Sequence, residues 1–203
     1  MKQNENADYI EIKTILLGEH AVGKTNLINA TIGADFKEES NPTLTSTYVE
    51  KKYNINETKY LMKIWDTVGM EKYRSLAKIF YKNSNIIIFV YDITRKKTFD
   101  ELEYWVNEVQ NNIENFHVKA IVGNKTDLFD FEQVDEEEAR DYSKSKRSCF
   151  KLVSAKENPK DFSLFMEEML KFYIKKKEGK LKDNNTKVVL NRKHNTKKKI
   201  CHC

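Results

Sequence analysis

The chain has 203 residues, a formal net charge of +5 and 39% hydrophobic residues. This length suits one domain with a single substantial core, and the hydrophobic content excludes a chain that is disordered throughout. No apolar run approaches the roughly 18 residues of a transmembrane helix, and the first residues lack the apolar segment of a secretory signal. Residue 2 is lysine rather than glycine, which disfavours N-myristoylation.

The positive charge is concentrated at one end. From Lys175 onward there are 11 basic and two acidic residues, a net charge of +9, which leaves residues 1–174 at −4. This asymmetry predicts a slightly acidic body with a basic appendage. We therefore expect a flexible N-terminus (1–8), one folded domain (9–177) and a disordered basic tail (178–203) that ends in Cys201-His202-Cys203.

Strand-like and helix-like segments alternate along the body. In chain order, the pattern predicts a strand over Ile10–Leu17, a helix over Lys24–Ile32, a hairpin of Tyr48–Ile55 and Lys59–Trp65, buried strands over Ile86–Tyr91 and Lys119–Val122, and a last strand over Cys149–Val153. Helical spacing predicts Phe99–Ile113, Asp135–Lys146 and Phe162–Lys175, the last with Leu164, Phe165, Leu170, Phe172 and Ile174 toward a core. Such alternation is typical of an α/β domain with one mostly parallel sheet. Cys149, inside a predicted strand, is interpreted as a reduced core residue.

A phosphate-binding loop stands between the first strand and the first helix. Residues 18–25, Gly-Glu-His-Ala-Val-Gly-Lys-Thr, match the pattern G-x-x-x-x-G-K-[ST]. The glycines let backbone N–H groups turn toward phosphate oxygens, Lys24 is placed to reach the β and γ phosphates, and Thr25 offers a hydroxyl to Mg²⁺. A chance match is on the order of one per cent or less at average residue usage. The loop predicts nucleotide binding without identifying the base.

Two segments that follow strands identify the base. Asn124-Lys125-Thr126-Asp127 lies at the carboxyl end of a predicted strand, where α/β sheets bind ligands. A carboxylate such as Asp127 accepts hydrogen bonds from both N1–H and N2–H₂ of guanine, whereas adenine has no such donor pair. Taken alone, Asp127 is better explained as a surface turn residue. Together with the phosphate loop and Ser154-Ala155-Lys156 it indicates a guanine site.

These motifs, in this order, resemble the Ras-like small GTPases over residues 9–175. The resemblance implies an α/β P-loop GTPase fold, with a mixed, mostly parallel six-stranded sheet and helices on both faces, that binds GTP or GDP with Mg²⁺ and hydrolyses GTP. It implies that Asn124 tethers its loop to the phosphate loop, Lys125 lies along base and ribose, and Phe36 packs on the base edge. The implied nucleotide-binding residues are Glu19, His20, Ala21, Val22, Gly23, Lys24, Thr25, Asn26, Phe36, Thr43, Gly69, Asn124, Lys125, Asp127, Leu128, Ser154, Ala155 and Lys156.

Residues 65–70, Trp-Asp-Thr-Val-Gly-Met, resemble the family's W-D-T-A-G-Q. The resemblance implies that Asp66 holds Mg²⁺ through a water and that the Gly69 N–H meets the γ-phosphate. Candidates for a further Mg²⁺ ligand are Thr43, Thr45 and Thr47, of which family spacing selects the first. The implied metal ligands are thus Thr25, Thr43 and Asp66, and the implied catalytic positions are Lys24, Thr43, Gly69 and Met70.

Three positions depart from the family pattern. Met70 replaces the glutamine that orients the attacking water, and a thioether lacks that hydrogen-bonding capacity, so we expect slow intrinsic GTP hydrolysis. The alternative is a GTP-locked effector-recruiting module with negligible turnover. His20 stands where a small residue is usual, and either crowds the γ-phosphate or faces solvent. Residues 44–48, Leu-Thr-Ser-Thr-Tyr, replace the family's common I-G-V-D-F, so the effectors of family members cannot be assigned to this chain.

The resemblance is greatest to the Rab branch. Residues 91–94, Tyr-Asp-Ile-Thr, followed by Lys97-Thr98-Phe99, look like a Rab stretch, and the C-x-C ending looks like a Rab signal for two geranylgeranyl groups on Cys201 and Cys203. Tyr48, Trp65 and Phe80 fall where Rabs carry the aromatic triad of the effector surface, although core packing explains Trp65 and Phe80 equally well.

This resemblance implies a monomeric switch that recruits effectors in vesicle trafficking. The implied partners are guanine nucleotide, effectors, an exchange factor, a GTPase-activating protein, a prenylation escort and a GDP-dissociation inhibitor. The implied location is the cytoplasmic face of endomembranes, in exchange with the cytosol.

The basic tail has three explanations: a membrane device, a solvated tail, or a nucleic-acid binder. Two lipids give the stable anchoring that one does not, and basic residues add attraction to an anionic leaflet. The tail contains no aromatic residues on which bases would stack, so a membrane is favoured over nucleic acid.

Overall fold

The strands at the centre of the sheet are largely apolar, which explains why both of their faces are buried. The computed structural model describes residues 9–37, 47–66, 80–179, 187–189 and 200–202. Within them, every residue of β4 (Ile86–Asp92) is buried, as are nearly all of β5 (Val118–Asn124) and the second half of β1 (Ile10–Leu17). Such strands are typical of a parallel sheet that is covered on both faces.

The six-stranded sheet has the order β2-β3-β1-β4-β5-β6. The hairpin of β2 (Thr47–Ile55) and β3 (Thr58–Asp66) is antiparallel, and all other pairs, out to β6 (Cys149–Leu152), are parallel. Asn56 and Glu57, both with positive φ, form the hairpin turn, a conformation that suits the twist of paired strands. The predicted mixed, mostly parallel six-stranded sheet is confirmed.

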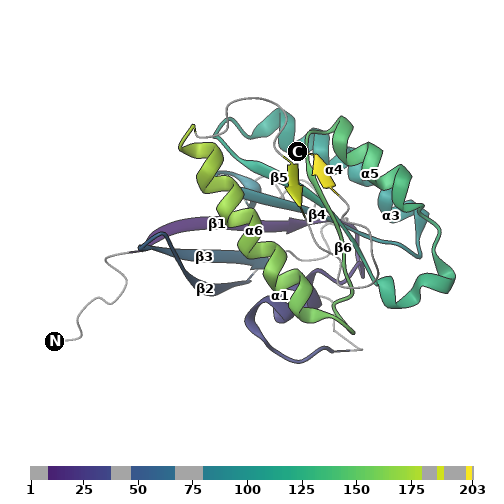
Figure 1. Ribbon diagram of the computed structural model, residues 1–203. Helices are drawn as coiled ribbons and strands as arrows, with labels where there is room; N and C mark the ends of the chain where they lie inside the picture. Colours follow the sequence, from purple (N-terminus) through teal and green to yellow (C-terminus); the bar gives the residue numbers. More distant parts are fainter. Residues whose placement is uncertain (1–8, 38–46, 67–79, 180–186, 190–199, 203) are drawn as a thin grey trace.

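Helices cover the two faces because the strand order reverses at β1. The connection from β1 to β3 contains α1 (Lys24–Ile32), and the connection from β4 to β5 runs the opposite way through α4 (Leu102–Asn112). Right-handed crossovers therefore place α1 and α4 on opposite faces. Figure 1 shows α6 (Pro159–Lys177) lying across the sheet, and this helix packs against α1, while α5 (Glu136–Ser145) contacts β6.

Several boundaries differ from the sequence expectation. The predicted helix Phe99–Ile113 is two helices, α3 (Lys96–Asp100) and α4, that meet at Glu101. Helix α6 begins three residues early because Pro159 suits a first helical turn. A 3-10 helix, η2 (Thr126–Phe131), was not predicted. On α6, Phe165, Leu170 and Phe172 are buried and Ile174 is half-buried, but Leu164 is 60% exposed, so its predicted core position is wrong.

Two features concern the cysteines and the tail. Cys149 is buried in β6, as expected, but it is disulfide-bonded, so its interpretation as a reduced thiol is wrong. Beyond α6, two three-residue strands, β7 (Lys187–Val189) and β8 (Ile200–His202), pair antiparallel. The sequence pattern did not predict these strands. The division of the chain into body and tail stays a prediction.

Candidate functional site

The phosphate-binding loop, residues 18–23, connects β1 to α1 and requires glycine at both ends. A Cβ on Gly18, whose φ is +149°, would lie 2.1 Å from the Val90 carbonyl oxygen. A Cβ on Gly23, whose φ is +94°, would lie 2.3 Å from Nδ2 of Asn124. Ala21 also has a positive φ of 58°. The loop is thus held against β4 and against the last residue of β5 by contacts that leave no space for side chains.

Lys24, the first residue of α1, reaches back over this loop. Lys24 is 6% exposed, and its ammonium donates to the carbonyl oxygens of Gly18 and Glu19, both at 2.8 Å. Val22 is fully buried in the core, whereas the neighbouring His20 and Ala21 are exposed. His20 is thus exposed on the loop, and both interpretations of its role stay predictions.

Thr25 and Asp66 meet at the start of α1 and the end of β3. The hydroxyl of Thr25 donates to Oδ2 of Asp66 at 2.9 Å, and Oδ1 of Asp66 is buried without a hydrogen-bond partner among the described residues. Burial raises the pKa of Asp66, opposed by the hydrogen bond from Thr25 and by the charge of Lys24. A buried carboxylate oxygen without a partner, beside a hydroxyl, matches the oxygen ligands that Mg²⁺ prefers, so these residues fit that ion.

Asn124 joins three loops at the carboxyl edge of the sheet. The residue is 2% exposed, and its side chain donates to the carbonyl oxygen of Val22 at 2.9 Å and accepts from the N–H of Ala155 at 3.2 Å. The phosphate loop, the loop after β5 and the loop after β6 are therefore held together through one amide. This contact agrees with the tether that the sequence resemblance implied.

The remaining base-loop residues surround this tether. Ser154, 2% exposed, donates to Oδ1 of Asp127 at 2.6 Å, and the carboxylate keeps further acceptor sites on both oxygens for a ligand. Lys125, with a left-handed φ of 69°, makes an ion pair of 2.7 Å with Asp92. Leu128 follows in η2 and is 40% exposed. These groups meet outside the carboxyl ends of β4, β5 and β6, where open α/β sheets bind ligands.

Comparisons with known proteins agree with this geometry. The sequence model of the Ras family matches residues 13–173. The chain is 37% identical over 157 residues to the Ras-related protein Rab-22A of Homo sapiens, covering 77% of this chain and 81% of that protein. It is 35% identical over 158 residues to the Ras-related protein Rab-21 of Geodia cydonium, covering 78% and 69%.

The chain belongs to the Rab branch of the Ras family. It is a Rab-family small GTPase, and the family activity is GTP hydrolysis with Mg²⁺. The resemblance on which the sequence expectations rested is confirmed.

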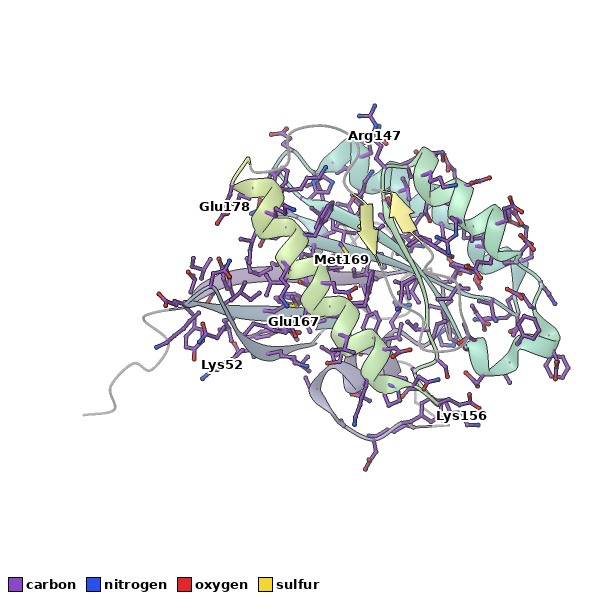
Figure 2. All side chains as sticks on the ribbon, in the orientation of Figure 1. Lys52, Arg147, Lys156, Glu167, Met169 and Glu178 are labelled. Atoms are coloured by element: carbon purple, nitrogen blue, oxygen red, sulfur yellow. The ribbon has the colours of Figure 1, made fainter. Side chains whose placement is uncertain are left out.

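In this Rab-family chain, Phe36 lies after α1 and is 39% exposed. Asn26 holds that segment, since its amide bonds both the N–H and the carbonyl oxygen of Lys37. The ammonium of Lys156 lies 6.0 Å from the centre of the Phe36 ring, and Figure 2 shows Lys156 on the loop that leads into α6. The two side chains thus approach from opposite ends of the sequence, next to the base loops.

The predicted effector triad forms one aromatic cluster of the Rab-family domain. The ring centroids of Tyr48 and Trp65 are 5.0 Å apart, and those of Trp65 and Phe80 are 6.4 Å apart. Tyr48 is 46% exposed, while Trp65 and Phe80 are partly buried and pack against the core. The ammonium of Lys13 lies over Trp65 at 5.3 Å, and that of Lys63 lies over Tyr48 at 5.8 Å. The cluster serves core packing and also has an accessible side.

Some predicted site residues lie outside the described part of the chain: Thr43, Gly69, Met70 and Cys203, together with the side chain of Cys201. Among the described residues, no helix has both the length and the apolar character needed to cross a membrane.

Sequence reasoning missed two residues of the Rab-family site, Asp92 and Arg95. Asp92 is 1% exposed at the carboxyl end of β4 and pairs with both Lys125 and Arg95. The available signal was a charged residue at the end of a fully buried strand. Arg95 gave no signal, because its bond to the phosphate loop links positions 75 residues apart.

Proposed function

We propose that this Rab-family GTPase is a GTP/GDP-regulated switch that recruits effectors to membranes in vesicle trafficking. The observation that carries the nucleotide part is the Asn124 amide, which holds the phosphate loop and both predicted base loops at one edge of the sheet. Asp127, oriented by Ser154, accepts the N1–H and N2–H₂ of guanine, and the Ala155 N–H is shared between Asn124 Oδ1 and guanine O6. Adenine offers no matching donors.

Each remaining residue has a proposed role. Lys24 stabilises the β and γ phosphates, and Thr25 and Asp66 hold Mg²⁺, with Thr43 and Gly69 completing the γ-phosphate side. When bound, Mg²⁺ neutralises charge that develops on the phosphates. In the GTP state the segments around Thr43 and Gly69 are ordered by these contacts, and hydrolysis releases them, so that effectors distinguish the two states through the Tyr48–Trp65–Phe80 surface.

Base selectivity tests the nucleotide site. Wild-type protein with Mg²⁺ is expected to bind fluorescently labelled GDP at least about 100-fold more tightly than labelled ADP, because ADP leaves the carboxylate of Asp127 unpaired. The matched variant Asp127→Asn should lose GDP and bind xanthosine diphosphate, whose C2 carbonyl accepts from the new amide. Equal affinity of the wild type for GDP and ADP would contradict guanine specificity.

The finer proposal is slow intrinsic hydrolysis, and it rests on Met70. No general base is assigned, and the thioether of Met70 neither donates to the γ-phosphate nor holds a water by two hydrogen bonds. The second candidate, a GTP-locked module with negligible turnover, rests on the same substitution. The two differ in whether GTP, once bound, decays to GDP on the protein.

The tail is proposed to attach the switch to the cytoplasmic face of endomembranes. Two geranylgeranyl groups on Cys201 and Cys203 supply the two anchors that stable attachment requires, and the +9 segment adds attraction to anionic lipid. Lipid attachment uses the free thiols of Cys201 and Cys203, so the proposal concerns the chain with these two cysteines reduced, as in the cytosol.

Replacing Cys201 and Cys203 together by serine is expected to move the protein from the membrane fraction to the cytosol, because the basic segment alone gives weak, salt-sensitive attraction. Fractionation of cells that express the two proteins measures this. The matched control Cys149→Ser alters the buried cysteine of β6 and should leave membrane attachment unchanged. Persistent attachment of the double variant would exclude lipidation of these cysteines as the anchor.

A further inference from the structure

Arg95 connects the end of β4 to the phosphate-binding loop. Its Nε donates to Oδ2 of Asp92 at 3.0 Å, and its Nη2 donates to the carbonyl oxygen of His20 at 3.0 Å. The planar guanidinium is suited to two acceptors at once, because its N–H donors have a fixed geometry. One side chain therefore links the exposed part of the loop to a buried carboxylate.

Asp92 is a fixed anchor for that side chain. Besides Arg95, its carboxylate accepts from the N–H of Thr94 at 3.0 Å, from the hydroxyl of Thr94 at 2.7 Å, and from Lys125, with which it pairs at 2.7 Å. Burial by itself would raise the pKa of Asp92, but hydrogen bonds from Lys125 and Thr94 outweigh it and hold the pKa below its ordinary value. The anchor is thus anionic at neutral pH, and the guanidinium is held in one place.

The bond to His20 determines which way one peptide group of the loop faces. In a trans peptide, the carbonyl oxygen of one residue and the N–H of the next point in opposite directions. When Arg95 holds the His20 oxygen outward, the Ala21 N–H points to the other side of the loop. The next peptide but one is held in the same way: Asn124 donates to the Val22 oxygen, so the N–H of Gly23 points in the opposite direction.

This peptide needs such support because of Ala21. With φ at 58°, Ala21 has a left-handed backbone, a conformation that is strained for a non-glycine residue. Both Ala21 and His20 are exposed, so packing does not hold them. Among the described residues, the side-chain bond that fixes the His20 oxygen comes from Arg95. Without it, rotation of the His20–Ala21 peptide is opposed by little else.

We propose that Arg95 is a positioning residue that holds the His20–Ala21 peptide with its N–H toward the nucleotide phosphates and thereby slows the release of GDP. The proposal rests on the proposed function, since it assumes that GDP occupies this loop. It assigns Arg95 no contact with the nucleotide itself. Its effect passes through one backbone N–H, and so it concerns how long the nucleotide stays bound.

Release of labelled GDP from full-length, Mg²⁺-loaded protein tests this. After chase with excess unlabelled GDP, Arg95→Ala is expected to lose label about three- to tenfold faster than wild type, the effect of about one hydrogen bond. Arg95→Lys should release label nearly as fast as Arg95→Ala does, because an ammonium cannot bridge Asp92 and the His20 oxygen in the same way. The association rate constant should stay within about twofold of wild type in both.

Lys97→Ala provides the matched control, because it removes an exposed cation from α3, the short helix for which Arg95 is the N-cap residue. Its release rate should equal that of wild type. The proposal would be overturned if both Arg95 variants released GDP at the wild-type rate. It would also be overturned if Arg95→Ala released GDP quickly while Arg95→Lys matched wild type, because the charge of residue 95 rather than its geometry would then be the cause. A wild-type protein that does not retain GDP would instead overturn the proposed function.

Discussion

Replacing Asn124 by alanine is expected to weaken GDP binding about 100-fold. The substitution removes the donor to the Val22 oxygen and the acceptor for the Ala155 N–H, both in buried surroundings. An unpaired buried polar group costs about 1–3 kcal/mol, and two such costs give several kcal/mol. In the nucleotide-free protein the loops relax to meet water, so the full cost falls on the bound state, where both loops must close on the ligand.

Calorimetric titration with GDP and Mg²⁺ measures the loss. The matched control is Asn85→Ala, at the opposite end of β4, where the amide accepts from the Lys13 N–H at 2.9 Å and donates to the Tyr173 hydroxyl at 3.0 Å. This variant loses comparable bonds far from the site, so its stability should fall while its GDP affinity does not. An Asn124→Ala affinity within about threefold of wild type would show that the loops are held together by other contacts.

Local signals in the sequence were sufficient for most of the fold. The strand Ile10–Leu17 and the helix Lys24–Ile32 were predicted to the residue, because an apolar run ends at Gly18 and the loop motif fixes where the helix begins. The sheet type followed from the fully apolar runs of β4 and β5. The break between α3 and α4 was missed, since Glu101 is an ordinary helix former and carries no breaker signal.

The candidate site likewise contains residues that the sequence predicted and residues that it missed. Thr25, Asp66, Asn124 and Asp127 were found because each stands in a motif with a known chemistry, and the structure brings them to one edge of the sheet. Arg95 was not found, because the role of an arginine side chain depends on which groups lie beside it in the folded chain. Its acceptor belongs to a loop whose backbone direction is a property of the folded chain. A contact between distant polar groups is thus predicted from sequence where a motif carries it, as for Asn124, and missed where none does, as for Arg95.

Restoring glutamine at position 70 is expected to raise intrinsic GTP hydrolysis by roughly 10- to 100-fold. A glutamine amide both accepts from the attacking water and donates to the γ-phosphate, whereas a thioether does neither well. Two hydrogen bonds that strengthen in the transition state are worth about 1 kcal/mol each, and each 1.4 kcal/mol is a factor of ten in rate. The comparison is single-turnover hydrolysis of preloaded GTP by wild type and Met70→Gln.

The comparison also decides between a slow switch and a locked module. Lys97→Gln introduces the same amide at an exposed position of α3 and should leave the rate unchanged, so an increase in Met70→Gln alone assigns the effect to the position. A measurable wild-type rate would support a slow switch, whereas wild-type decay indistinguishable from nucleotide release would support a locked module. Equal rates in wild type and Met70→Gln would mean that the water is oriented by other groups, and the thioether would then not limit turnover.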